Sequence, residues 1–115
     1  MAVARPARVP GRGEVYLVEL DPTRGSEIRK TRPCLVVSPD ELNHQLRTAI
    51  VAPMTTAGHA YPFRPTCRFA GKEGRVALDQ LRTVDRERFR KRLGVLGSAN
   101  VEAIFATLAE MFEID

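Results

Sequence analysis

Residues 14–37 read EVYLVELDPTRGSEIRKTRPCLVV, and this stretch decides the fold class that the sequence predicts. Residues 14–20 are rich in β-forming side chains and end at an Asp-Pro turn signal, so they are expected to form a strand. Residues 33–38 include a continuous apolar run, which is typical of a central strand buried on both faces. The intervening residues 21–32 are too polar to be buried, so they predict an exposed loop, where functional residues are common.

Short strands separated by turn signals continue along the chain. The run at 48–52 predicts another buried strand, which Pro53 is expected to end. Residues 61–69 contain two prolines, and they suit an edge or irregular strand because proline cannot donate a ladder hydrogen bond. Further expected elements are a turn at Gly71 and Gly74 and strands at 75–78 and 88–96.

Two segments predict helices. Residues 40–46 suit a short helical turn with Asp40 as its N-cap, and Ser98 is the expected N-cap of a longer C-terminal helix. Five or six short strands and one terminal helix predict a mainly β fold, a small half-open barrel with the helix packed against one face. The amphipathic stripe of that helix follows i, i+3, i+4, i+7 spacing and consists of Val101, Ile104, Phe105, Leu108, Met111 and Phe112.

Length and composition favour one soluble domain. The 115 residues predict a single folded unit at 13–115, preceded by a flexible basic arm at 1–12. No run approaches the ~20 apolar residues of a membrane span, and the first residues lack the apolar core of a secretory signal. Lys plus Arg is 18 against 14 for Asp plus Glu, and only three of the 18 are lysine. Arginine suits phosphate binding, but a biased genomic base composition explains the same ratio, so both explanations stay open.

The cysteines and histidines form no recognisable metal or redox motif. Cys34 and Cys67 belong to no C-x-x-C pair, and Cys34 lies in an apolar run, where it is expected to be a core residue. His44 and His59 do not stand at metal-ligand spacing, so no metal or other cofactor is expected. Since a chain of this size needs no disulfide, a reducing cytoplasm is the expected compartment.

Polar side chains gather at the predicted strand ends, and neighbouring strand ends come close together in a small barrel. An arginine there can clamp a phosphodiester and stabilise charge that develops on its oxygens. An ion pair on the barrel rim with a turn-capping threonine explains the same pattern, and spacing alone favours this second interpretation, because polar loop residues are common. The residues concerned are Glu27, Arg32, Thr55, Asp79, Gln80 and Arg82.

Residues 86–92 hold five basic residues and one acid, Glu87. On a strand, Arg88, Arg90 and Arg92 point to one face, which forms either a phosphate-binding ridge or an ordinary solvated surface.

Motifs that share their order and spacing with one known family cover residues 12–112. They are Gly13-Glu14-Val15-Tyr16, Leu20-Asp21-Pro22-Thr23, Gly25-Ser26-Glu27, Lys30-Thr31-Arg32-Pro33, Val36-Val37-Ser38-Pro39, Pro53-Met54-Thr55-Thr56, Tyr61-Pro62-Phe63, Leu78-Asp79-Gln80-Leu81-Arg82 and Lys91-Arg92-Leu93-Gly94. Together they resemble the MazF/PemK (Kid-like) toxins of type II toxin–antitoxin systems. The resemblance implies an SH3-like barrel that works as a homodimer. It also implies a metal-independent, sequence-specific endoribonuclease that cuts single-stranded RNA through a 2′,3′-cyclic phosphate, held inactive by a cognate MazE-like antitoxin.

The same resemblance assigns roles to individual residues. Arg32 and Thr55 match the family's catalytic arginine and threonine, and Glu27 matches an acid tied to activity in some members. Asp79 matches an acid that some Kid-like members use in cleavage, although Ala77 stands where those members have an arginine. Because arginine is always protonated, Arg32 is expected to stabilise charge, which leaves Glu27 as the candidate general base and Thr55 as a phosphate ligand. RNA contacts are expected from Lys30, Thr56, Gln80, Arg82, Arg88 and Arg90.

Two alternatives use the same fold. A CcdB-like gyrase poison binds a topoisomerase without catalytic residues, and a non-catalytic barrel binds RNA without cutting it. The combination of Arg32-Pro33, the Thr55-Thr56 pair and Asp79-Gln80 favours the endoribonuclease, because a binder has no need of it.

Overall fold

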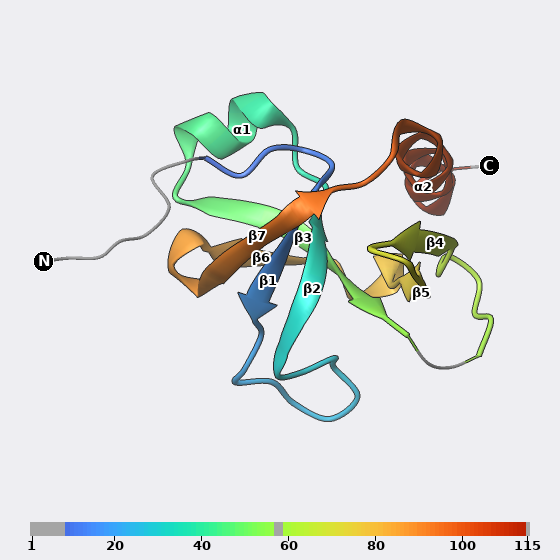
Figure 1. Ribbon diagram of the computed structural model, residues 1–115, viewed down its shortest axis with the longest axis horizontal. Coiled ribbons are helices and arrows are strands. Elements are labelled where there is room, and N and C mark those ends of the chain that lie inside the picture. The colour runs from blue at the N-terminus through green and yellow to red at the C-terminus, as the bar shows by residue number, and fades with distance from the viewer. Residues whose placement is uncertain (1–8, 57–58, 115) are drawn as a thin grey trace, which may run out of the picture.

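The computed structural model describes residues 9–56 and 59–114, which form a curled antiparallel sheet with two α-helices (Figure 1). Along the path β4-β5-β3-β2-β1-β7 neighbouring strands pair, and β6 pairs with β3 beside this path. The strands are β1 (Glu14–Glu19), β2 (Thr31–Val36), β3 (Thr48–Thr55), β4 (Thr66–Phe69), β5 (Lys72–Val76), β6 (Arg82–Asp85) and β7 (Phe89–Val95). The helices are α1 (Asp40–Gln45), α2 (Ser98–Met111) and the short 3₁₀ turns η1 (Leu78–Gln80) and η2 (Arg86–Arg88).

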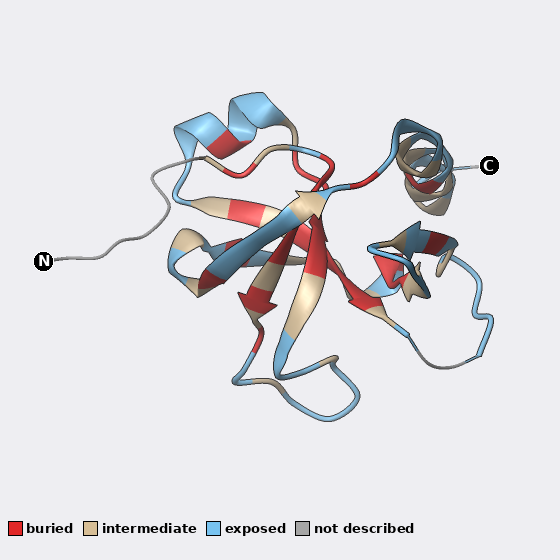
Figure 2. Cartoon of the chain, viewed as in Figure 1, coloured by how far each residue is buried: buried red, intermediate tan, exposed pale blue. Residues whose placement is uncertain are grey.

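Strand β1 is largely buried, and β2 is buried on both faces from Cys34 to Val36, as the apolar run at 33–38 predicts, whereas Thr31 at its start is exposed (Figure 2). Because side chains alternate along a strand, Val15 and Leu35 enter one core, which also holds Ile104 of α2. Tyr16 and Cys34 enter a second core on the opposite face, where the rings of Tyr16 and Phe89 meet edge to face at 5.1 Å. Two cores thus share one sheet, and this curls it into the half-barrel.

Strand β3 continues through Pro53 instead of ending there, so that prediction is wrong. Pro53 pairs with Cys34 at the last position of the β2–β3 ladder, and the next residue, Met54, already pairs with Val76 of β5. Its missing N–H therefore falls where β3 changes partners, and its carbonyl still accepts from the Ala77 N–H at 2.8 Å. This junction lets one strand reach from the main sheet to the β4–β5 hairpin, which includes the predicted edge strand β4.

Both helix-cap predictions are wrong. Pro39 is the N-cap of α1 and Gly97 that of α2, and neither helix has a side-chain cap hydrogen bond. Asp40 lies one residue inside α1, where its carboxylate accepts the Arg12 backbone N–H at 2.8 Å.

Helix α2 lies beside the β4–β5 hairpin (Figure 1) and buries Ile104 completely, while Phe112 stays 67% exposed. At the other end, the described part of the predicted arm packs on the domain, because Pro10 is buried and the Arg12 Nε donates to the Val37 carbonyl at 2.9 Å. Residues 1–8 lie outside the described part, so the flexibility of the arm stays a prediction. Within the described residues, neither helix has the length and apolar character that a bilayer span requires.

Candidate functional site

Arg32 and Thr55 line one cavity of about 330 Å³. Arg32 comes from the start of β2, and its Nε donates to the Arg29 carbonyl at 3.0 Å, which fixes the direction of the guanidinium. Thr55 is the last residue of β3 and pairs with Arg75 of β5. The structure therefore brings together the two residues expected to be catalytic. The cavity also includes Thr56, Lys72 and Glu73, and apolar side chains from Pro33, Met54, Cys67, Phe69 and Leu93.

The wall beside Thr55 depends on a glycine. A Cβ built on Gly74 of β5 would lie 2.6 Å from the Thr55 carbonyl oxygen, closer than real Cβ atoms come to a backbone oxygen. Only a glycine lets β5 approach β3 so closely at this point. This close approach fixes the position of Thr55 in the cavity wall. In the sequence this glycine looks like an ordinary turn residue.

The two cysteines are thiols at neutral pH. Burial raises the pKa of Cys34 to about 12, and burial also raises the pKa of Cys67, which borders the cavity. Because only a thiolate is a strong nucleophile, Cys67 contributes an apolar surface to the cavity and no covalent chemistry.

The remaining polar candidates border a different cleft, of about 760 Å³. It lies between the β1–β2 loop (residues 20–30) and the segment from η1 to β6. Glu27 is the last residue of a tight turn in this loop, where its Oε1 accepts the Arg24 N–H at 2.7 Å. The structure thus separates the predicted site into two concavities. Glu27, Asp79, Gln80 and Arg82 border the cleft and not the cavity of Arg32 and Thr55.

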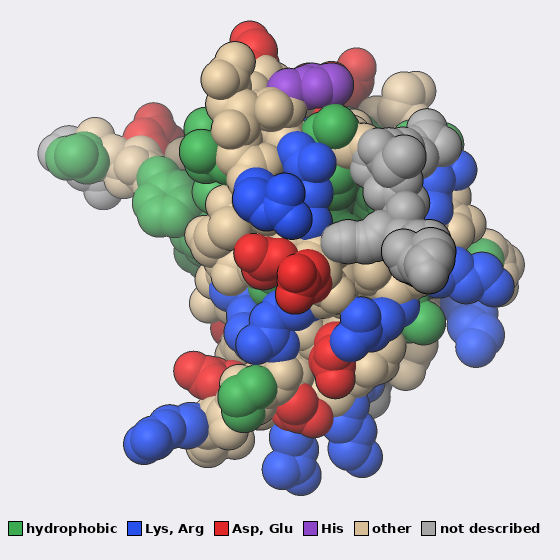
Figure 3. Space-filling model, turned by 90° about the vertical axis from the view of Figure 1, so that its left-hand side faces the viewer, with side chains coloured by type: hydrophobic (Ala, Val, Ile, Leu, Met, Phe, Trp, Pro, Cys, Tyr) green, Lys and Arg blue, Asp and Glu red, His purple; other side chains and the backbone are tan. Residues whose placement is uncertain are grey.

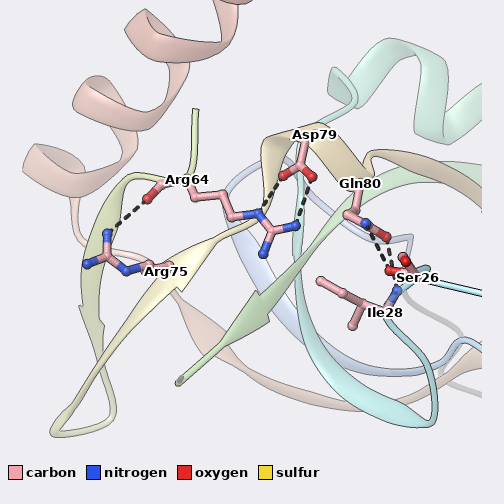
Figure 4. A network of polar contacts seen from close by, with 6 residues as sticks. All are labelled: Ser26, Ile28, Arg64, Arg75, Asp79 and Gln80. Carbon is pink, nitrogen blue, oxygen red and sulfur yellow. Dashed lines mark hydrogen bonds and ion pairs between the residues drawn. The ribbon is translucent and has the colours of Figure 1, made fainter. Parts of the chain in front are cut away.

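Asp79 has a partner that sequence reasoning missed (Figure 4). The Arg64 Nε and a terminal nitrogen donate to the two carboxylate oxygens at 2.7 and 2.8 Å. These hydrogen bonds from Arg64 lower the pKa of Asp79, although partial burial opposes the shift. The Tyr61 ring lies 5.1 Å from the same guanidinium. Arg64, which lies in the connection between β3 and β4, thus lies beside Asp79. In the Kid-like members, an arginine flanks this aspartate at the position that Ala77 occupies here. No local sequence motif predicts an ion pair between two residues that lie fifteen positions apart in the chain.

Gln80 and Arg82 hold the backbone of the β1–β2 loop. The Gln80 Oε1 accepts the Ile28 N–H at 3.0 Å, and its Nε2 donates to the Ser26 carbonyl at 3.4 Å (Figure 4). Arg82 donates to the Leu20 carbonyl at 3.0 Å. Among the predicted RNA contacts, Lys30 is exposed at a left-handed backbone position (φ 73°) in the same loop.

The basic stretch at 86–92 is only partly a strand, because Arg88 lies in η2 and β7 begins at Phe89. The expectation that Arg88 shares a strand face with Arg90 is therefore wrong. Arg88 donates to the Glu19 and Asp21 carbonyls, and Arg90 forms an ion pair with Glu19. Figure 3 shows acidic side chains among the basic ones at this end of the molecule, so the surface is of mixed charge.

In the part of the chain that the structure describes, no group of three or more His, Cys, Asp or Glu side chains is placed to hold a metal ion.

With the fold and both concavities in place, comparison with known proteins is informative. Residues 11–112 match the family model described as PemK-like, MazF-like toxin of type II toxin-antitoxin system. The chain belongs to this family. The chain is similar to the endoribonuclease PemK of Escherichia coli, with 42% identity over 82 residues, which are 64% of this chain and 59% of the relative. The match thus spans less than two thirds of that relative's length.

Solved MazF structures share the fold of this member of the family. The crystal structure of MazF from Deinococcus radiodurans superimposes with a TM-score of 0.81 at 27% identity, covering 93% of this chain and 99% of that chain. A MazE–MazF structure from the same organism gives a TM-score of 0.77 at 25% identity, covering 94% and 100%. The predicted barrel with a C-terminal helix is therefore confirmed.

Proposed function

We propose that this chain is the toxin of a type II toxin–antitoxin system and acts as a metal-independent, sequence-specific endoribonuclease on single-stranded RNA. The observation that carries this proposal is that Arg32 and Thr55 line one cavity, with Arg32 oriented by the Arg29 carbonyl. Membership of the toxin family and similarity to the PemK endoribonuclease support it over a gyrase poison on the same fold.

Arg32 and Thr55 act on the phosphate in this proposal. The ribose 2′-oxygen bonds to phosphorus while its proton passes to a base, the bond to the 5′-oxygen breaks, and the 5′-oxygen takes up a proton. The Arg32 guanidinium stabilises the negative charge that builds up on the phosphate oxygens, because its donors are already oriented before the reaction begins. The Thr55 hydroxyl binds one of these oxygens.

The polar cleft takes the adjoining RNA. Glu27, whose Oε1 is held by the Arg24 N–H, is our candidate for the general base. Asp79 forms an ion pair with Arg64. We therefore assign Asp79 first to shaping the cleft and only second to proton transfer. The remaining predicted RNA contacts are Lys30, Thr56, Arg82, Arg88 and Arg90. The three arginines donate hydrogen bonds to backbone carbonyls of the protein, and these bonds set the positions in which their side chains would meet RNA.

The proposed partners follow from the family. A cognate MazE-like antitoxin inhibits this chain. The similarity of the chain to a MazE–MazF structure from Deinococcus radiodurans supports this partner. We further propose that the active form is a homodimer and that it works in the cytoplasm, without a cofactor.

The function is tested by incubating purified chain with single-stranded RNA in EDTA and sequencing the fragment ends. We expect cleavage at a defined sequence, with 2′,3′-cyclic phosphate and 5′-hydroxyl ends. Intact RNA, or cleavage that requires added Mg²⁺, would overturn the proposal. Inhibition of DNA gyrase with intact RNA would favour the poison instead.

A further inference from the structure

The β1–β2 loop is fastened to η1 by one side chain. Gln80 lies in η1, far from this loop in the sequence, and its amide bonds to the backbone of Ser26 and Ile28. These two residues flank Glu27, so one side chain brackets the backbone of that residue (Figure 4). The terminal amide of Gln80 uses its oxygen to accept the Ile28 N–H and its nitrogen to donate to the Ser26 carbonyl.

The backbone that Gln80 holds is adjacent to the carbonyl that orients Arg32. Arg29, whose carbonyl accepts the Arg32 Nε–H at 3.0 Å, directly follows the residue whose N–H Gln80 holds. On the other side of Arg29, the Lys30 carbonyl accepts the Leu20 N–H at 2.9 Å. The Arg29 carbonyl therefore lies between two anchored points, and the Gln80 amide supplies one of them.

We propose that Gln80 is a positioning residue for Arg32, acting through the Ile28–Arg29 backbone. The consequence for catalysis rests on the proposed ribonuclease function. In this role both polar groups of Gln80 are committed to the loop, which differs from the direct RNA contact expected from the sequence. If the anchor is lost, the Arg29 carbonyl moves and Arg32 no longer points reproducibly at the phosphate. A misplacement of about 1 Å in a catalytic group can cost ~10²-fold in rate.

The test compares Gln80→Met, which keeps the length of the side chain and removes both hydrogen bonds, with Gln80→Glu, which keeps an acceptor for Ile28 and loses the donor to Ser26. Gln45→Met is the matched control, because Gln45 is exposed at the end of α1. Two readouts are taken: kcat and KM on a fluorescent RNA, and hydrogen exchange by NMR of the Ile28 amide and the Arg32 Nε–H.

We expect Gln80→Met to lower kcat by ~10- to 10²-fold with KM changed less than about threefold, since the loss concerns orientation and not RNA binding. Exchange at the Ile28 amide and at the Arg32 Nε–H should accelerate together. Gln80→Glu should give a smaller kcat loss and retain more protection at Ile28. Gln45→Met should match the wild type in every readout.

The outcomes that overturn the proposal are specific. A raised KM with unchanged kcat would make Gln80 an RNA contact. Unchanged exchange at the Arg32 Nε–H in Gln80→Met would show that the loop holds Arg32 without the amide. If Gln80→Met does not fold, Gln80→Glu alone decides by the same two criteria. If the wild type does not cut RNA, the proposed function fails, yet the exchange experiment still decides whether Gln80 positions Arg32.

Discussion

The cavity of Arg32 borders β2, the cleft of Glu27 borders the loop that joins β1 to β2, and the two are built differently. Strand side chains such as Met54 and Cys67, packed in the core, wall the cavity of Arg32. Loop residues held by side-chain hydrogen bonds from Gln80 and Arg82 wall the cleft. Packed strands keep their shape at low cost, whereas a loop fastened at a few points can open locally. The strand walls of the cavity are therefore more rigid than the cleft, while the direction of the Arg32 guanidinium depends on the loop through the Arg29 carbonyl.

The largest effect is expected in the rigid cavity. Arg32→Ala should reduce cleavage by ~10²–10³-fold or more, because it removes the donor that stabilises developing charge. The free energy of unfolding should change by less than about 1 kcal/mol, as for other half-exposed residues. Cleavage rates and melting curves check both statements, with Arg47→Ala, on an exposed residue, as the control. A rate close to wild type would place the phosphate site elsewhere.

The second effect tests whether the cleft takes part in chemistry. Glu27→Gln keeps the oxygen that accepts the Arg24 N–H and removes the basic carboxylate. If Glu27 is the general base, kcat should fall by ~10²-fold with little change in KM. Single-turnover kinetics measure this directly. A loss smaller than threefold would confine the chemistry to the cavity and leave the cleft a binding surface only.

The third effect tests the rigidity of the cavity wall. Gly74→Ala forces a Cβ against the Thr55 carbonyl, and because that atom is backbone the two strands must separate. We expect a loss of about 1–3 kcal/mol in stability, the usual cost of overpacking, together with reduced cleavage. Chemical denaturation and rate measurements check this. Gly97→Ala is the control, because nothing lies within 4 Å of its Cβ position, and equal behaviour of the two variants would contradict the close approach.

The smallest effect concerns the ion pair at the edge of the cleft. Arg64 lowers the pKa of Asp79, so the pair stabilises the fold fully above the ordinary carboxyl pKa and loses this contribution as pH falls through the lowered value. Asp79 is 43% exposed, so solvent screening limits the pair to about 1 kcal/mol or less.

Asp79→Asn should therefore lower Tm slightly at pH 7, with a difference from wild type that shrinks as the pH approaches 3. Melting curves across this pH range give the answer. If the difference in Tm between Asp79→Asn and the wild type stays constant with pH, the charge of Asp79 does not stabilise the fold.

Local patterns in the chain predicted both α-helices, most of the strands and the family, but not β6. The β-forming residues 14–20 predicted a strand, and the continuous apolar run at 33–38 predicted a central strand buried on both faces. The stripe on α2 likewise predicted a packed helix. The junction at Pro53 could not be predicted, because whether a missing N–H matters depends on which strand lies opposite.

For the site, the sequence by itself determined which residues are candidates for the chemistry, and only the tertiary structure decided how they are grouped. Arg32 and Thr55 line the same cavity because β2 and β3 pair, whereas Glu27 borders a separate cleft. The Arg64–Asp79 pair and the Gln80 fastening join segments distant in the chain. Such contacts depend on sheet closure, which brings distant backbone groups within about 3 Å of a side chain, the reach of a hydrogen bond. No periodicity or local motif contains that information.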